Sequence, residues 1–148
     1  MRVGGEVWRL GQQANLEKFI DLGLGVIRIT PELSKVKFMR QITIQPNLTE
    51  WLTKFPPSKF PIIPANARRM IQHVREKFEL GDDVLRHTFI SMHVARFKSL
   101  GDAALQAGNS ETMIRRHYLN LVGAAEAEKF WNIAPGGQGG EMIEMRAG

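Results

Sequence analysis

Four prolines fall within nine residues of this 148-residue chain, in the stretch PPSKFPIIP at 56–64. Proline fixes φ and lacks a backbone N–H, so helix interiors and central strands exclude it, and this stretch is predicted to be a loop. The segments before it indicate strands and one helix, whereas those after it have helical spacing. A small antiparallel sheet followed by a helical bundle predicts an α+β fold that is mostly helical.

Two segments before the proline-rich stretch have the composition of strands. GVIRITPE at 25–32 is rich in β-branched residues, and FMRQITIQ at 38–45 alternates apolar and polar residues. The short link between them carries lysines, so an antiparallel β-hairpin with lysines at its tip is expected. PNLTEWLTKF at 46–55 is expected to form a helix with Asn47 as its N-cap and Glu50 three residues later.

The rest of the chain is predicted to form helices separated by glycine and asparagine breaks. The first is expected over 65–80, and Gly81 ends it. The second is expected to start after Asp82 or Asp83 as its N-cap and to carry Leu85, Phe89 and Met92 on one face. Three shorter helices are expected over 101–107, 111–121 and 124–133. Residues 135–148 are rich in glycine, so a single domain over 1–134 with a loose tail is expected.

The charge is basic and unevenly distributed. The chain has 20 Lys and Arg against 15 Asp and Glu, a net charge of +5. Between positions 33 and 75, eight basic residues are opposed by one acid, Glu50. Such a segment can attract a polyanion such as nucleic acid, or it can form a solvated basic face.

Several classes of protein are excluded or disfavoured by what the sequence lacks. It has no cysteine, which excludes disulfide frameworks and thiolate metal sites. It has no run of about 18 apolar residues, so no membrane span is expected. Its first residues lack the apolar core of a signal peptide, so a cytoplasmic location is the default expectation.

Some residues suit the cleavage of a phosphodiester, whose anionic oxygens repel nucleophiles. Cleavage without a metal needs cations on the non-bridging oxygens, an in-line nucleophile and an acid for the departing hydroxyl. Arg86 and Lys35 are candidate cations, and Tyr118, the only tyrosine, is the candidate nucleophile. The four histidines lack a metal-binding spacing, so no cofactor is expected.

The motifs around Arg86 and Tyr118 resemble those of the tyrosine recombinases, or phage integrases. LRHTF at 85–89, AGNSETMIRRHY at 107–118 and a following short helix are similar to that family's catalytic domain, which carries H-x-x-R-H-T/S-F, then L-G-H-S, then a tyrosine. Arg86 and Asn109 are 109 − 86 = 23 residues apart, and Asn109 and Tyr118 are 118 − 109 = 9 apart, as in the family. The resemblance covers about 25–133 and is strongest over 83–118.

The resemblance implies DNA strand breakage and rejoining, as in site-specific recombination or integration, with double-stranded DNA as partner. Tyr118 would form a 3′-phosphotyrosyl bond, and Arg86 would stabilise the charge on the phosphoryl oxygens. A lysine would protonate the departing 5′-hydroxyl. SKVKFMRQITIQP at 34–46 resembles the family's lysine-bearing hairpin, with Lys35 the better match and Lys37 the second. No ATP or metal is implied.

Three positions depart from the family pattern. Asp83 stands where the family has its first histidine, and it also suits a helix N-cap. Asn109 stands where the family has its second histidine; its amide can donate to phosphate, or it can be a cap or turn residue. The family's first arginine has only Arg2 as candidate, in a G-L-R-x-x-E-like stretch one residue too long. The family's N-terminal domain is not matched, so weak activity is expected.

The remaining candidates concern binding surfaces. Possible DNA contacts are Lys37, Arg40, His87, Arg115, Arg116 and His117. His87 also suits a structural role behind Arg86, and the adjacent arginines suit a solvated face. An exposed Phe130, Trp131 and Ile133 would form an apolar patch for self-association through the C-terminal helix. Trp131, like Trp8 and Trp51, also suits a core or interface position. The alternatives to a strand-transfer enzyme are a DNA-binding or protein-interacting remnant that does not cleave, and a basic domain without a nucleic-acid role.

Overall fold

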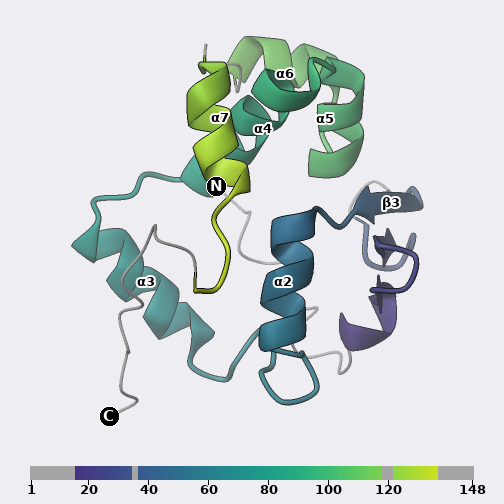
Figure 1. Ribbon diagram of the computed structural model, residues 1–148, viewed down its shortest axis with the longest axis vertical. Coiled ribbons are helices and arrows are strands. Elements are labelled where there is room, and N and C mark those ends of the chain that lie inside the picture. The colour runs from purple at the N-terminus through teal and green to yellow at the C-terminus, as the bar shows by residue number, and fades with distance from the viewer. Residues whose placement is uncertain (1–15, 35–36, 118–121, 137–148) are drawn as a thin grey trace.

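The structure is a computed structural model that describes residues 16–34, 37–117 and 122–136 (Figure 1). Its elements in chain order are η1 Leu16–Phe19, β1 Ile20–Asp21, β2 Val26–Ile29, β3 Arg40–Thr43, α2 Pro46–Lys54, α3 Ala67–Lys77, α4 Val84–Phe97, α5 Leu100–Ala107, α6 Glu111–His117 and α7 Ala124–Trp131. The expected α+β class is confirmed. The proposed tail falls mostly outside the described residues.

The sheet has three antiparallel strands in the order β1-β2-β3. β2 and β3 form the expected hairpin, with Ile27 opposite Ile42 and Ile29 opposite Arg40. Sequence reasoning missed β1, which pairs Ile20 with Ile27, because two residues are too short for a periodic signal. Lys35, expected at the hairpin tip, lies outside the described residues.

The helical part gathers α4, α5, α6 and α7 into one group (Figure 1). The largest side chains of its core are Ile90 of α4, Ile114 of α6 and Trp131 of α7. The sheet lies to one side of α2 and α3 to the other, with α3 set apart from the main helical group. Among the described residues, no helix is long and apolar enough to cross a membrane.

A buried glutamine joins the sheet to the helical group. The Thr43 backbone N–H of β3 donates to Oε1 of Gln106 at 2.8 Å. Nε2 of Gln106 in turn lies 3.2 Å from Oγ1 of Thr43 and 3.3 Å from Oδ1 of Asp102. Because Gln106 belongs to α5 and bonds a strand 63 positions earlier, these contacts fix β3 against α5.

Two helix ends differ from the sequence expectation. Asn47 is not the N-cap of α2: Gln45 holds that position, and Oδ1 of Asn47 accepts from the neighbouring Leu48 N–H at 2.9 Å. The helix starts at Pro46 because proline suits the first helical position, where its missing N–H costs nothing. α3 ends at Lys77, before the expected Gly81, because Glu79 adopts a left-handed conformation with φ of +50°.

The expected buried face of α4 is wrong at Leu85, whose exposure is 78%. The fully buried residues of α4 all lie between Ile90 and Ala95, further along the helix. This is the part that packs against α5 and α7, whereas Leu85 lies in the first turn, before those contacts begin. The spacing of apolar residues therefore predicted the helix, but it did not predict which part of the helix is buried by α5 and α7.

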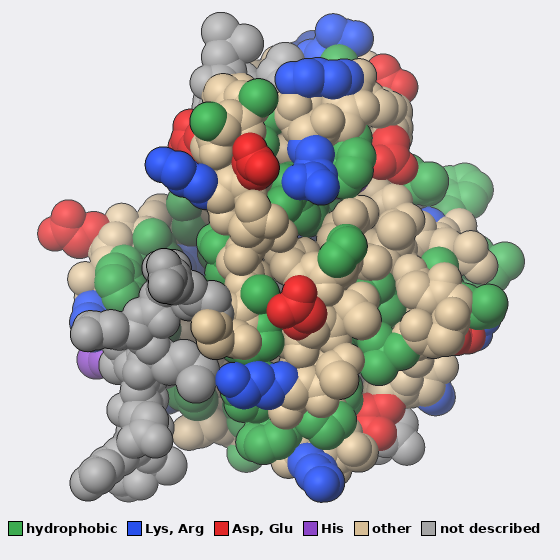
Figure 2. Space-filling view, in the orientation of Figure 1, with side chains coloured by type: hydrophobic (Ala, Val, Ile, Leu, Met, Phe, Trp, Pro, Cys, Tyr) green, Lys and Arg blue, Asp and Glu red, His purple; other side chains and the backbone are tan. Residues whose placement is uncertain are grey.

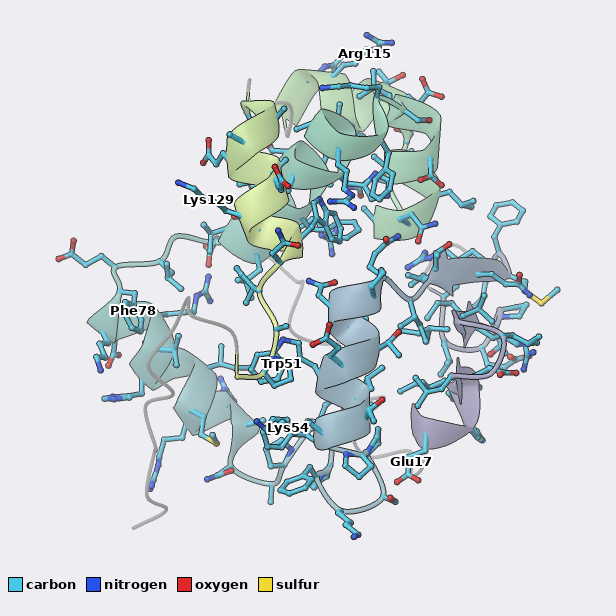
Figure 3. The ribbon with its side chains drawn as sticks, in the orientation of Figure 1. Glu17, Trp51, Lys54, Phe78, Arg115 and Lys129 are labelled. Atoms are coloured by element: carbon cyan, nitrogen blue, oxygen red, sulfur yellow. The ribbon has the colours of Figure 1, made fainter. Side chains whose placement is uncertain are left out.

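Of the two interpretations of Trp131, a core residue or part of an exposed apolar patch, the structure confirms the core, because Trp131 is only 9% exposed. Its ring packs edge-on against Phe89 and Phe97 of α4, and its Nε1 donates to the Met92 carbonyl at 3.2 Å. Trp131 is therefore a core residue of its own chain. Ile133, just beyond α7, remains exposed, and its carbonyl accepts from Nε1 of Trp51 on α2 at 3.2 Å (Figure 3).

His93 of α4 is the buried titratable group of this core, with an exposure of 1%. Its Nε2 lies 3.1 Å from Oδ2 of Asp102, and its ring packs on Phe97 with 4.5 Å between ring centroids. Burial lowers the pKa of His93, and the Asp102 carboxylate partly offsets this effect. The geometry therefore suits a neutral imidazole that donates its Nε2–H to Asp102.

The free energy of unfolding is expected to fall as the pH drops below about 6.5, the ordinary histidine pKa. The unfolded chain takes up a proton there that folded His93 resists, so its contribution is complete above that pH and lost below it. Urea unfolding between about pH 8 and pH 5 measures this slope. His93→Gln should flatten it, whereas His73→Gln, at an exposed position, should leave it unchanged. Equal slopes in wild type and His93→Gln would contradict the assignment.

Candidate functional site

Three of the residues singled out in the sequence converge on one region. Arg40 begins β3, Arg86 lies in α4, and Asn109 follows α5 in the turn that leads to α6. The described chain therefore brings together residues from the hairpin and from the two motifs that contain Arg86 and Asn109. Tyr118, Lys35 and Arg2 lie outside the described residues, as does the side chain of His117.

Arg40 lies directly against the turn at Gly108. Gly108 has a φ of +68°, in the left-handed region that glycine adopts without steric cost. A Cβ added there would lie only 2.5 Å from Cζ of Arg40. Because Gly108 has no side chain, the Arg40 guanidinium can occupy this space, next to Asn109.

Arg40 is also within electrostatic range of Arg86. Burial, and then the positive charge of Arg86, lower the pKa of the Arg40 guanidinium from its ordinary value. Arginine remains protonated at neutral pH nonetheless, so two positive charges face each other here. Within the described part of the chain, Arg40 has no carboxylate in ion-pair range, and its Nε is buried without a hydrogen-bond partner.

Asn109 presents a second buried donor. Its backbone N–H bonds the Ala104 carbonyl at 2.9 Å, whereas its side-chain Nδ2 has no partner among the described residues. The N-terminal turn of α6 is capped by Ser110 instead, whose Oγ accepts from the Met113 N–H at 3.2 Å. The structure is compatible with both interpretations of Asn109. Its backbone forms the turn, and its side-chain amide has no hydrogen-bond partner among the described residues.

The Asp83 carboxylate lies near Arg86 and does not cap the helix that follows it. Asp83 holds the N-cap position of α4, but its φ is +61° and its side chain makes no capping hydrogen bond. Its Oδ1 lies 3.6 Å from Nε of Arg86, and the two side chains are 24% and 36% exposed. The carboxylate therefore offsets part of the positive charge of Arg86.

The other candidate DNA contacts are spread over the molecule. Lys37 is exposed in the hairpin loop with a φ of +57°, and His87 is half-buried in α4. Arg115 and Arg116 are exposed on α6, and Figure 3 shows Arg115 pointing outward at the end of the molecule farthest from Lys54. On the face in Figure 2 the Lys and Arg side chains are separated by other surface, with no continuous basic patch.

Sequence reasoning placed Arg40 only among general DNA contacts. A signal for its inward position was nevertheless present, because Arg40 alternates with Ile42 and Ile44, and residues two apart on a strand share one face. A charged residue in register with two isoleucines is unusual and indicates a partner or a ligand. The contact with Gly108 depends on tertiary packing and had no sequence signal.

No protein-family model, curated protein or solved structure matches the chain. Among the residues described by the structure, no three His, Asp or Glu side chains gather as metal ligands.

Proposed function

We propose that the chain breaks and rejoins DNA strands as the catalytic domain of a tyrosine recombinase, with Tyr118 as nucleophile. The observation that carries this proposal is the convergence of Arg86 and the Asn109 turn around Arg40. Arg86 and Asn109 occupy two motif positions 23 residues apart, and the proposal needs both near one phosphate. The order hairpin, α4, α5, α6 and α7 supports a fold of the same type.

The proposed reaction exchanges one phosphoester for another. The Tyr118 hydroxyl loses its proton to solvent as its oxygen attacks the scissile phosphorus, a P–O bond to tyrosine forms, and the bond to the 5′ oxygen breaks. Arg86 and the Asn109 amide carry the charge on the non-bridging oxygens, and Lys35 gives its proton to the departing 5′-hydroxyl. Attack by a 5′-hydroxyl on the phosphotyrosine reverses these steps and rejoins a strand.

A covalent protein–DNA adduct is the direct test. The full chain is incubated with supercoiled plasmid and with nicked duplexes, quenched in detergent, and analysed for protein whose mobility is shifted by bound DNA. Wild type should give the adduct, and Tyr118→Phe should abolish it because the ring keeps its shape but loses the nucleophilic oxygen. An adduct of equal yield in Tyr118→Phe would show that another residue is the nucleophile, and the assignment would fail.

A second function is favoured by one observation, the Asp83 carboxylate 3.6 Å from Arg86. A negative charge beside a phosphate site opposes both binding and transition-state stabilisation. The alternative is a domain that binds DNA without cleaving it. Such a domain would give no adduct but would bind duplex DNA with an affinity that falls steeply as salt rises, because bound cations release counterions. A flat salt response would exclude DNA binding of either kind.

A further inference from the structure

We infer that Arg40 is a phosphate ligand, so that one phosphate group is held between the guanidinium groups of Arg40 and Arg86 and the side-chain amide of Asn109. Nothing in the sequence motifs assigns this role to Arg40. As a site for a phosphate group the inference rests on two donors that have no partner in the described part of the chain and on the packing of Arg40 against Gly108. As a site for a DNA phosphodiester it rests on the proposed function.

The two buried atoms of this site that the described residues leave without a partner are both hydrogen-bond donors, and donors of this kind favour an anionic ligand. Nε of Arg40 and Nδ2 of Asn109 are buried without partners within the described residues, and both are hydrogen-bond donors. Buried polar atoms are almost always hydrogen-bonded in folded proteins, so two orphan donors close to one turn indicate a missing acceptor. A phosphate group carries several acceptor oxygens and the negative charge that two arginines require.

The charge balance of the cluster points the same way. Arg40 and Arg86 bring two positive charges and Asp83 brings one negative charge, which is paired with Arg86 on the side of Nε. Arg40 is left without a counter-charge in the described part of the chain, although it is half-buried. Keeping like charges together in a region of lowered dielectric is unfavourable, and a bound oxyanion would relieve that repulsion.

The cluster is also held by regular elements. Arg40 is fixed in β3 by its pairing with Ile29, and β3 is fixed to α5 through Thr43 and Gln106. α5 ends at Gly108, where the guanidinium lies. Two donors are therefore positioned before any ligand arrives, which lowers the cost of ordering them on binding.

The first experiment measures the binding of inorganic phosphate to the full chain by calorimetry at constant ionic strength. Arg40→Gln should weaken binding about ten- to a hundredfold, the effect of losing a charge-assisted hydrogen-bonding group. Arg28→Gln is the matched control because Arg28 lies on the neighbouring strand and is paired with Asp21 at 3.0 Å. Equal phosphate affinity in the two variants, with both folded by circular dichroism, would overturn the inference.

A pair of glycine variants tests the geometry independently. Gly108→Ala adds a Cβ that displaces the Arg40 guanidinium, whereas Gly25→Ala has a similar φ of +65° but nothing within 4 Å of its Cβ. Both variants strain the backbone, and only Gly108→Ala should lose phosphate affinity, again by about tenfold or more. A loss of the same size in Gly25→Ala would show that strain, and not the guanidinium, is responsible.

The Asp83 carboxylate provides a change in the opposite direction. Asp83→Asn removes the negative charge while retaining a residue that tolerates the left-handed conformation. Phosphate affinity should rise by about three- to tenfold because Arg86 no longer shares its charge and the repulsion of the ligand is gone. A fall in affinity in this variant would contradict the placement of the phosphate beside Arg86.

A competition experiment distinguishes a DNA phosphodiester from a free phosphate group as the ligand. If the ligand is a DNA phosphodiester, a short duplex should displace inorganic phosphate, and Arg40→Gln should lower the yield of the Tyr118 adduct. If phosphate binds but the duplex does not compete, the ligand is a free phosphate group, and the site stands without the DNA reaction. An adduct that forms at the wild-type rate in Arg40→Gln would overturn the role of Arg40 and leave the proposed function intact.

Discussion

Replacing Trp131 with alanine is expected to lower the free energy of unfolding by about 3–5 kcal/mol. The ring of Trp131 is buried between α4 and α7, where it meets Phe89, His93, Phe97 and Phe130 edge-on. Truncation removes this apolar contact, leaves a cavity, and deprives the Met92 carbonyl of its bond to Nε1. Equilibrium unfolding in guanidinium chloride measures the loss.

Two further variants separate the contributions at Trp131. Trp131→Phe keeps a ring but loses the hydrogen bond to Met92 and part of the volume, so a smaller loss of about 1–2 kcal/mol is expected. Ile133→Ala, two residues away, should cost less than about 1 kcal/mol because Ile133 is 55% exposed. If Trp131→Ala costs no more than Ile133→Ala, the packing of α7 on α4 is wrong. Light scattering on Ile133→Ala tests the remaining route to self-association through this end of the chain.

The second large effect is expected at Ile114, the fully buried residue of α6. Ile114→Ala should lower the free energy of unfolding by about 2–5 kcal/mol, since it empties the contact between α6 and the core formed by Ile90, Ala103 and Ala104. Met113→Ala is the matched control on the same helix, because Met113 is largely exposed and its truncation should cost little.

Ile114 also bears on the proposed chemistry, because Tyr118 follows it by four residues in the sequence. A helix whose only fully buried side chain is truncated should hold the residues after it less firmly. The adduct yield at a temperature where Ile114→Ala is still folded is therefore expected to fall relative to Met113→Ala. Equal yields in the two variants would show that the anchoring of α6 does not limit the reaction.

Features set by local sequence were predicted well. α5 begins at Leu100 with Ser99 as its N-cap, one residue before the expected start at Gly101. The hairpin followed from β-branched composition, and the break at Gly108 from its neighbours Asn109 and Ser110. In each case a few adjacent residues determine the backbone. The buried length of α4 and the particular partners of Trp131, which suited a core position, could not be predicted because both depend on which helices cover α4, and such packing is distant in sequence.

In the candidate site, too, local sequence motifs could be recognised, whereas contacts that depend on tertiary packing could not. The spacing of Arg86 and Asn109 could be found by counting, because both belong to a continuous motif. The contact of Arg40 with the turn at Gly108 could not, because it depends on β3 docking against α5 through a bond between residues 63 positions apart. The contact of Asp83 with Arg86 was obscured by a competing role: aspartate is a favoured N-cap, and that preference predicted a backbone bond in place of the ion pair.

The contact between Thr43 and Gln106 also determines how copies of this chain can meet. An unpaired strand edge is a template for intermolecular pairing and aggregation. The outer N–H of Thr43 on β3 is already bonded by Gln106, so an incoming strand could not use that ladder position. The opposite edge of the sheet is β1, and its two residues offer too little backbone for stable pairing. The bond from Gln106 therefore makes this edge of the sheet a poorer template for a second copy of the chain.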